Sequence, residues 1–209
     1  MNWADMTLRE FQAALSSSSP TPGGGTASAV ALGQAASLSI MVCDLTLANE
    51  KWQDGWAIAE QIQTMAIPMM GRSNKLATED SQAFDRVMES FGLPKTTDEE
   101  KSNRRGAIRD ATLEAAVVPF ETASLALKLL TSLPDLAAMG NGNAVTDVGV
   151  AGLLASAAAK GAVFNVEINL DSLPKEMGES IRKELPELKE RTRIASRAVM
   201  DAVRERMGQ

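Results

Sequence analysis

Residues 27–48 form a long stretch of small and apolar side chains in which Asp44 is the single charge, and this stretch constrains the fold most. Its small side chains allow neighbouring helices to approach closely. A membrane span is the alternative for so apolar a segment, but Asp44 and the many alanines and serines favour a buried core helix. Apolar residues recur at helical spacing along almost the whole chain. The sequence therefore predicts an all-α protein, a single-domain bundle of long, partly kinked helices over residues 1–209.

Two of the helix starts have clear signals. Thr7 with Glu10, and Thr97 with Glu100, have the spacing of a capping box, in which two side chains satisfy backbone amides of the first turn. Residues 163–170 would suit a strand by propensity, but the sequence offers no second strand to pair with them, so we expect a helix. The expected helices are a short one after Thr7, 27–48, 54–91 with a break near Pro68 and Gly71, about 98–132 with a kink at Pro119, 146–170, and a pair within 172–208 around Pro186.

The composition limits the chemistry that is available. The chain has no histidine and no tyrosine, which removes imidazole metal sites, Ser/His/Asp triads and phenolic acids. Acid–base chemistry would therefore rest on carboxylates or lysines. The single cysteine, Cys43, cannot form an intrachain disulfide and is expected to be buried and inert.

The charge balance bears on partners and compartment. The chain has 21 basic and 27 acidic residues, a net charge of −6, which argues against a nucleic-acid or anionic-membrane surface but leaves a local anion site open. Residues 1–5 have neither the basic nor the apolar region of a signal peptide. We therefore expect a cytoplasmic protein without nucleic-acid or membrane partners, and nothing in the sequence indicates a bound metal.

The segment Pro22-Gly23-Gly24-Gly25-Thr26 leads directly into the apolar helix and is a candidate ligand cradle. Glycine permits φ > 0 and lets backbone amides approach a bound group closely. Amides at the start of the following helix would then face an anion or a polar heterocycle. The serines and prolines before it would also suit a flexible linker, which we disfavour because the helix starts without a polar spacer.

Asp80 is the candidate acid–base residue. It falls in an apolar stripe at helical spacing with Leu76, Phe84, Val87, Met88 and Phe91. A carboxylate there must be paired, protonated or functional, and burial would raise its pKa toward neutrality. The alternatives are a partly exposed aspartate at the helix edge, or one paired with a lysine or arginine from another element.

Two further groups of polar residues stand out. Lys95 precedes a helix, in a turn fixed by Pro94. A positive charge there opposes the helix dipole, so we expect an acidic partner, either Asp80 or a ligand. The alternative is an ordinary solvated lysine. The second group is Asn141, Asp147, Asn165 and Asn169. Asp147 suits a helix cap, and the two asparagines at i, i+4 could share one ligand or satisfy buried backbone groups.

Together these motifs resemble the formiminotransferase-cyclodeaminase/methenyltetrahydrofolate cyclohydrolase family of all-helical folate enzymes, over nearly the whole chain. The matching pieces, in order, are Pro22 to Thr26, Met41-Val42 with Leu45-Thr46, Asp80 with Ala83-Phe84, Leu93 to Lys95, Arg105, Pro119, Gly140-Asn141, Asp147, and Asn165 to Asn169. The chain departs from the family at residues 48–52, where a glycine, a lysine cluster and a tyrosine are typical.

The resemblance implies a cyclodeaminase-like fold and a cytoplasmic homodimer, or a higher assembly of dimers, that acts on a tetrahydrofolate derivative without a bound cofactor. The implied reaction is hydrolysis of 5,10-methenyltetrahydrofolate to 10-formyltetrahydrofolate. Asp80 would move the proton, and Lys95 would tune Asp80 or hold the pterin or the acidic tail. The residues implied to bind the folate are Pro22, Gly23, Gly24, Gly25, Thr26, Asn141, Asp147, Asn165 and Asn169.

Two other functions stay open from the sequence. Ring closure of 5-formiminotetrahydrofolate with loss of ammonia needs the same carbon and the same proton transfer, so a cyclodeaminase is the first alternative. We prefer the cyclohydrolase because the chain lacks the formiminotransferase domain that is fused to cyclodeaminases in bifunctional relatives. A folate-binding or assembly subunit without catalysis is the second alternative, which the altered residues 48–52 favour and the presence of Asp80 and Lys95 disfavours.

Overall fold

The computed structural model of the protein describes residues 2–208, and every regular element in that range is a helix. The predicted all-α fold is therefore confirmed. The α-helices are α1 (Leu8–Leu15), α2 (Gly24–Leu47), α3 (Trp56–Phe91), α4 (Asp98–Met139), α5 (Val145–Asp171) and α6 (Glu179–Met207). Short 3-10 turns are η1 (Trp3–Asp5), η2 (Glu50–Gly55) and η3 (Gly142–Ala144).

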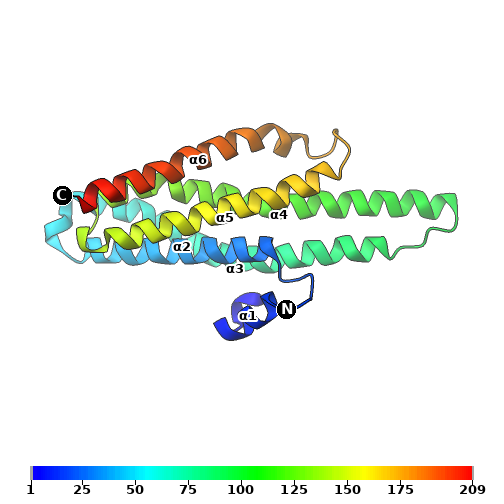
Figure 1. Cartoon of the computed structure of the whole chain (residues 1–209), viewed down its shortest axis with the longest axis horizontal. Coiled ribbons are helices and arrows are strands. Elements are labelled where there is room, and N and C mark those ends of the chain that lie inside the picture. Colours follow the sequence, from blue (N-terminus) through cyan, green and yellow to red (C-terminus); the bar gives the residue numbers. More distant parts are fainter. Residues whose placement is uncertain (1, 209) are drawn as a thin grey trace.

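Four of the helices form a ring. Helix α2 packs between α3 and α5, α4 packs between the same two neighbours on the other side, and α6 lies along α4 and α5. Figure 1 shows the helices running nearly side by side, with the α3–α4 hairpin projecting beyond the ends of α2, α5 and α6. The short helix α1 lies outside the bundle, close to the N-terminus.

Small residues allow the close packing that the sequence predicts for α2. Gly33 faces Ser73 of α3, where a Cβ at residue 33 would lie 2.5 Å from Ser73 Oγ. On the other side, Ser28 fits against Gly161 of α5, and a Cβ there would overlap the Ser28 hydroxyl. Leucines and valines of α4, α5 and α6 fill the common core. Helix α2 is thus held at close range by both of its neighbours.

Both predicted capping boxes are present. The Thr7 hydroxyl accepts from the Glu10 backbone N–H while the Glu10 carboxylate accepts from the Thr7 N–H, and Thr97 and Glu100 do the same at the start of α4. The segment 163–170 is helical within α5, as expected.

Prolines end fewer helices than expected. The break near Pro68 is wrong, because α3 runs without interruption to Phe91. The predicted pair of helices around Pro186 is also wrong, since α6 is one helix from Glu179 to Met207. Pro68 and Pro186 are both exposed, so water can bind the carbonyl group that each proline leaves without an amide partner. Helix α4 likewise continues past the expected end to Met139, through Pro134.

Three helical segments, Gly24–Leu47, Asp98–Met139 and Gly142–Asp171, are long and apolar enough to cross a membrane by length and composition alone. In this structure they pack against one another around the common core. Only 44% of the most apolar window of Gly24–Leu47 is buried. The bundle therefore leaves a substantial apolar surface uncovered.

We predict that two glycines outside the candidate site respond oppositely to alanine. A Cβ at Gly55 would lie 2.8 Å from the carbonyl carbon of Met139, so Gly55→Ala should lower the free energy of unfolding by about 1–3 kcal/mol. Gly71 lies inside α3, where an added Cβ would have no neighbour within 4 Å, so Gly71→Ala should raise that free energy by about 0.5–1 kcal/mol. Urea denaturation measures both, and equal effects would contradict the packing described for Gly55.

Candidate active site

The N-terminus of α2 lacks a capping side chain of its own. The N-cap residue is Gly23, which makes no side-chain hydrogen bond to the first turn. Asp80 of α3 takes this place, because its Oδ2 accepts from Thr26 Oγ1 at 3.0 Å and its carboxylate also accepts from the Thr26 backbone N–H. A carboxylate at a helix N-terminus is favoured by the unpaired amides and by the helix dipole.

Gly25 leaves the space that the Asp80 carboxylate occupies. A Cβ at residue 25 would lie 2.6 Å from Asp80 Cγ and 2.7 Å from Oδ2, closer than real Cβ contacts allow. Within residues 2–208 only Gly178 has a positive φ, so close approach is what the structure requires of Gly25. The freedom of glycine to adopt φ > 0 is therefore not used in this segment.

Burial and hydrogen bonding act in opposite directions on Asp80. The side chain is partly buried, and desolvation raises the pKa of the carboxyl group, while the two hydrogen bonds from Thr26 lower it. Burial has the larger effect, so the pKa lies above that of an ordinary aspartate. The interpretation of Asp80 as an aspartate paired with a lysine or arginine is not what the structure shows, because its partner is Thr26. Asp80 can therefore take up and release a proton closer to neutrality than a solvated aspartate can.

The glycine segment is part of this packed site. Pro22, Gly25 and Thr26 are buried, Gly23 is partly buried, and Gly24 is exposed at the helix start. The linker interpretation is therefore wrong for these residues. A Cβ at Gly24 would meet nothing closer than Asn165 Nδ2 of α5, at 3.9 Å. The exposed Gly24 thus lies beside Asn165, and the next residue, Gly25, packs against the Asp80 carboxylate.

The two asparagines of α5 hold the backbone. Asn165 Nδ2 donates to Gly161 O at 2.9 Å, and Asn169 Nδ2 donates to Ala115 O of α4 at 2.7 Å. These bonds agree with the expectation that the amides satisfy backbone groups. The structure therefore brings the glycine segment, Asp80 and Asn165 to one end of the ring, and Asn169 follows one turn along the same helix.

Asn141 and Asp147 lie at the opposite end of α2. Asn141 Nδ2 donates to Leu45 O, and the Asn141 N–H donates to Thr46 Oγ1, each at 3.0 Å. Asn141 Oδ1 also accepts from the Asn143 N–H, a turn contact. Because Gly25 and Thr46 are 21 residues apart on one helix, this end lies about 30 Å from Asp80. Within one chain, the predicted grouping of Asn141 and Asp147 with Asp80 is wrong.

Lys95 is also remote within the chain. It is exposed in the turn between α3 and α4, at the tip of the projecting hairpin (Figure 1). Helix α3 continues for 11 residues after Asp80, about 16 Å, before this turn begins. The structure thus does not pair Lys95 with Asp80 in the same chain.

Trp3 and Ser81 belong to the site although the sequence analysis did not select them. Trp3 Nε1 donates to Ser81 Oγ at 2.8 Å, and Ser81 Oγ lies 3.0 Å from Thr26 Oγ1. A tryptophan in the first turn of a chain has no motif that would signal this contact. Ser81 is buried in the structure. In the sequence, only its place directly after Asp80 offers a weak signal that it belongs to the site.

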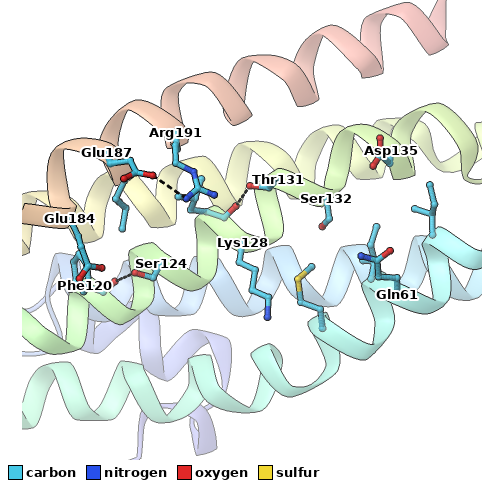
Figure 2. Close-up of a pocket in the computed structure, with 15 residues that line it drawn as sticks. Gln61, Phe120, Ser124, Lys128, Thr131, Ser132, Asp135, Glu184, Glu187 and Arg191 are labelled. Atoms are coloured by element: carbon cyan, nitrogen blue, oxygen red, sulfur yellow. Dashed lines mark hydrogen bonds and ion pairs between the residues drawn. The ribbon is translucent and has the colours of Figure 1, made fainter. Parts of the chain in front are cut away.

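A separate groove lies over α4, between α3 and α6 (Figure 2). Its volume is about 580 Å³, and its rim mixes Lys128 and Arg191 with Asp135, Glu184 and Glu187. Glu187 and Arg191 form an ion pair at 3.5 Å. None of the candidate site residues lines this groove, and its mixed charge does not select an anion.

Comparison with known proteins agrees with the resemblance seen in the motifs. The model of the formiminotransferase-cyclodeaminase family matches residues 7–187. Methenyltetrahydrofolate cyclohydrolase of Methylorubrum extorquens is 36% identical over 167 residues, which cover 80% of each chain. Formimidoyltransferase-cyclodeaminase of Mus musculus is 30% identical over 183 residues, which cover 86% of this chain and 32% of that longer protein.

The fold agrees as well. The crystal structure of formiminotetrahydrofolate cyclodeaminase from Thermotoga maritima matches with a TM-score of 0.86 and 27% identity, covering 97% of this chain and 98% of the other. The all-helical bundle is thus shared with a formiminotetrahydrofolate cyclodeaminase. The chain belongs to the formiminotransferase-cyclodeaminase family.

We predict that Gly25 and Gly24, adjacent in sequence, respond differently to alanine. Gly25→Ala should lower the free energy of unfolding by about 1–3 kcal/mol, because the methyl group must displace the Asp80 carboxylate from Thr26. Gly24→Ala should change it by no more than about 0.5 kcal/mol, because its Cβ has room. Urea denaturation of both variants tests this, and similar losses would show that the fit around Asp80 is not what excludes a side chain at residue 25.

Proposed function

We propose that this protein is a methenyltetrahydrofolate cyclohydrolase, which hydrolyses 5,10-methenyltetrahydrofolate to 10-formyltetrahydrofolate. The observation that carries the proposal is the Asp80 carboxylate at the start of α2, with its raised pKa and with the exposed backbone of Gly24 beside it. The Methylorubrum extorquens relative, of similar length, has this activity in its name. The proposed site combines a proton acceptor with backbone that a flat heterocycle can approach.

The chemistry needs little beyond a well-placed carboxylate. The carbon that bridges N5 and N10 is a cationic amidinium carbon, so water can add to it once a base accepts the water proton. Asp80 accepts that proton as the C–O bond forms, and then gives it to N5 as the C–N5 bond breaks. The hydroxyl proton of the adduct is released as the formyl C=O forms, so the net products are 10-formyltetrahydrofolate and one proton. The charge of Asp80 also favours the cationic substrate before the reaction.

The neighbouring residues would place the pterin and its bridge. Gly24 leaves the backbone open at the helix start, and Asn165 lies beside it from α5. We further infer that the protein acts in the cytoplasm. We also infer that it needs no resident cofactor, because the reactive carbon belongs to the substrate.

Cyclodeamination of 5-formiminotetrahydrofolate is the second candidate, and the high structural similarity to a cyclodeaminase favours it. The same carboxylate would serve, because ring closure needs a proton delivered to the departing ammonia. Loss of methenyltetrahydrofolate absorbance without ammonia release establishes the hydrolase. Release of ammonia with accumulation of the methenyl compound would identify a cyclodeaminase instead, and bound folate with neither reaction would indicate a subunit without catalysis.

We predict that Asp80→Asn lowers kcat for methenyltetrahydrofolate hydrolysis by about 10²–10⁴-fold while the fold is kept. Asp135→Asn, in the separate groove, is the matched control and should leave kcat unchanged. Activity of the wild-type enzyme should fall as the pH drops through the raised pKa of Asp80, because the ionised form accepts the water proton. This acid limb should therefore lie above about pH 4, the ordinary range of an aspartate. Near-normal turnover of Asp80→Asn would remove Asp80 from the mechanism.

We also propose that the protein is a homodimer through the outer face of α2 and α5. Exposed apolar residues gather there: Met41 and Leu45 on α2, Ile67 and Met70 on α3, and Val150, Leu153, Phe164 and Ile168 on α5. A shallow groove of about 700 Å³ runs along α2 within this face, lined almost wholly by uncharged side chains. An uncharged apolar face is complementary to a second copy of itself, as a two-fold interface requires.

Such a dimer would also bring together the two groups of candidate folate residues, which lie at opposite ends of α2 in one chain. A two-fold axis across the middle of α2 brings the Thr46 end of one copy toward the Gly25 end of the other. Asn141 and Asp147 of one subunit would then approach Asp80 of its partner. This arrangement accounts for family motifs that lie at opposite ends of a single chain.

We predict that Leu153→Glu converts the dimer to a monomer, because it places a charge in the apolar face of α5, where Leu153 is 59% exposed. Ile194→Glu on α6 is the matched control, since Ile194 is 53% exposed outside this face, and should stay dimeric. Light scattering at micromolar concentration measures the mass of both. A monomeric wild-type protein, or a dimer that tolerates Leu153→Glu, would contradict the proposed face.

A further inference from the structure

Trp3 stands at the head of a line of hydrogen bonds that ends at Asp80. Trp3 Nε1 donates to Ser81 Oγ at 2.8 Å, Ser81 Oγ lies 3.0 Å from Thr26 Oγ1, and Thr26 Oγ1 donates to Asp80 Oδ2 at 3.0 Å. Thr26 and Ser81 are buried, with 0% and 4% of their surface exposed. Bulk water therefore does not compete for the protons of the two hydroxyl groups.

The chemistry of the groups sets the direction of every bond in this line. An indole N–H can only donate, so Ser81 accepts from Trp3. The single proton of the Thr26 hydroxyl points to the carboxylate, which is the stronger acceptor. The bond between the two hydroxyl groups is then donated by Ser81 to Thr26. Three donors in succession therefore point toward Asp80, and each bond polarises the next.

We propose that Trp3 and Ser81 are positioning residues of the active site. They hold the Thr26 hydroxyl as a donor to Asp80 Oδ2, which fixes the orientation of the carboxylate that exchanges a proton with the substrate. This inference rests on the proposed role of Asp80 as the proton acceptor. It assigns to the N-terminal segment a part in catalysis, although that segment lies outside the helical ring.

The indole itself is held in a fixed orientation. The Trp3 backbone N–H donates to Thr78 Oγ1 at 3.4 Å, and Thr78 donates in turn to Asn2 Oδ1 at 3.2 Å. The Trp3 ring meets Phe11 of α1 edge to face, with centroids 6.5 Å apart, and packs against a core cluster that includes Leu76. These contacts tie η1 to α3 and aim the indole N–H at Ser81.

Within one chain, the groups found close to Asp80 are uncharged. They are Thr26 from α2, Ser81 from α3 and, beyond Gly24, Asn165 from α5. Among the charged side chains of α3 and α4, Arg72 pairs with Glu79 and Glu121, and Arg86 pairs with Glu114. The protonation of Asp80 therefore responds mainly to burial and to the line of hydroxyl groups.

We predict that Trp3→Phe, which keeps the ring and removes the N–H, moves the acid limb of the kcat profile to higher pH by roughly half a pH unit. Without the indole donor, the Ser81 and Thr26 protons can reorient, and the ionised form of Asp80 loses part of its hydrogen bonding. Turnover on that limb should fall about threefold with KM little changed. Ser196→Ala is the control, because it removes a hydroxyl bond to Ser156 between α5 and α6, away from both groups of candidate residues, and should leave the limb in place.

Carbon-13 NMR titration of the Asp80 carboxyl group tests the inference without any turnover. The pKa of Asp80 should rise in Trp3→Phe and in Ser81→Ala, and the double variant should show no more than the larger single effect, because both changes break the same line. An unchanged pKa in both folded single variants would overturn the proposal. If the wild-type protein proved inactive on folates, the proposed function would fail, while a raised pKa in these variants would still establish the hydrogen-bonded line.

Discussion

The contact between Asp80 and the first turn of α2 is the interaction on which the rest of the site depends. Helix α2 starts with glycines and has no capping side chain, so its first amides need an acceptor from elsewhere in the fold. Asp80 supplies that acceptor, and Gly25 leaves the space for it. The same contact joins α2 to α3 and fixes the position of a carboxylate that is partly withdrawn from water. Structural capping and the proposed acid–base chemistry are therefore two uses of one side chain.

The pKa of Asp80 reflects a compromise between these uses. Capping favours the charged carboxylate, while burial favours the neutral acid, and burial has the larger effect. Because the folded state holds the proton more tightly than the unfolded chain, this group weakens the fold as the pH rises from the ordinary aspartate range through its raised pKa. A group that served only as a cap would be better placed in water. Its partial burial supports the proposed role in proton transfer.

The sequence predicted the local features well and the long-range ones poorly. Capping boxes at Thr7 and Thr97 depend only on neighbouring residues, and both are present. Asp80 is partly buried, as its place in an apolar stripe suggests, although Phe84, Met88 and Phe91 of the same stripe are exposed. The sequence wrongly predicted helix breaks at Pro68 and Pro186, because solvation of the freed carbonyl group depends on which side of the helix faces water. Asn141 was grouped with Asp80 because motif order along a chain does not say which helix ends meet, and antiparallel packing of α2 and α5 separates them.

The hydrogen bond between Trp3 and Ser81 joins residues 78 positions apart, which has a consequence for how the enzyme matures. Trp3 is synthesised before its acceptor Ser81, and α3 must form before the N-terminal turn can pack against it. Asn165 enters the site later still, with α5. The contributors to the proposed proton-transfer site are thus synthesised far apart in time, and the site is complete only when α5 has packed onto the bundle.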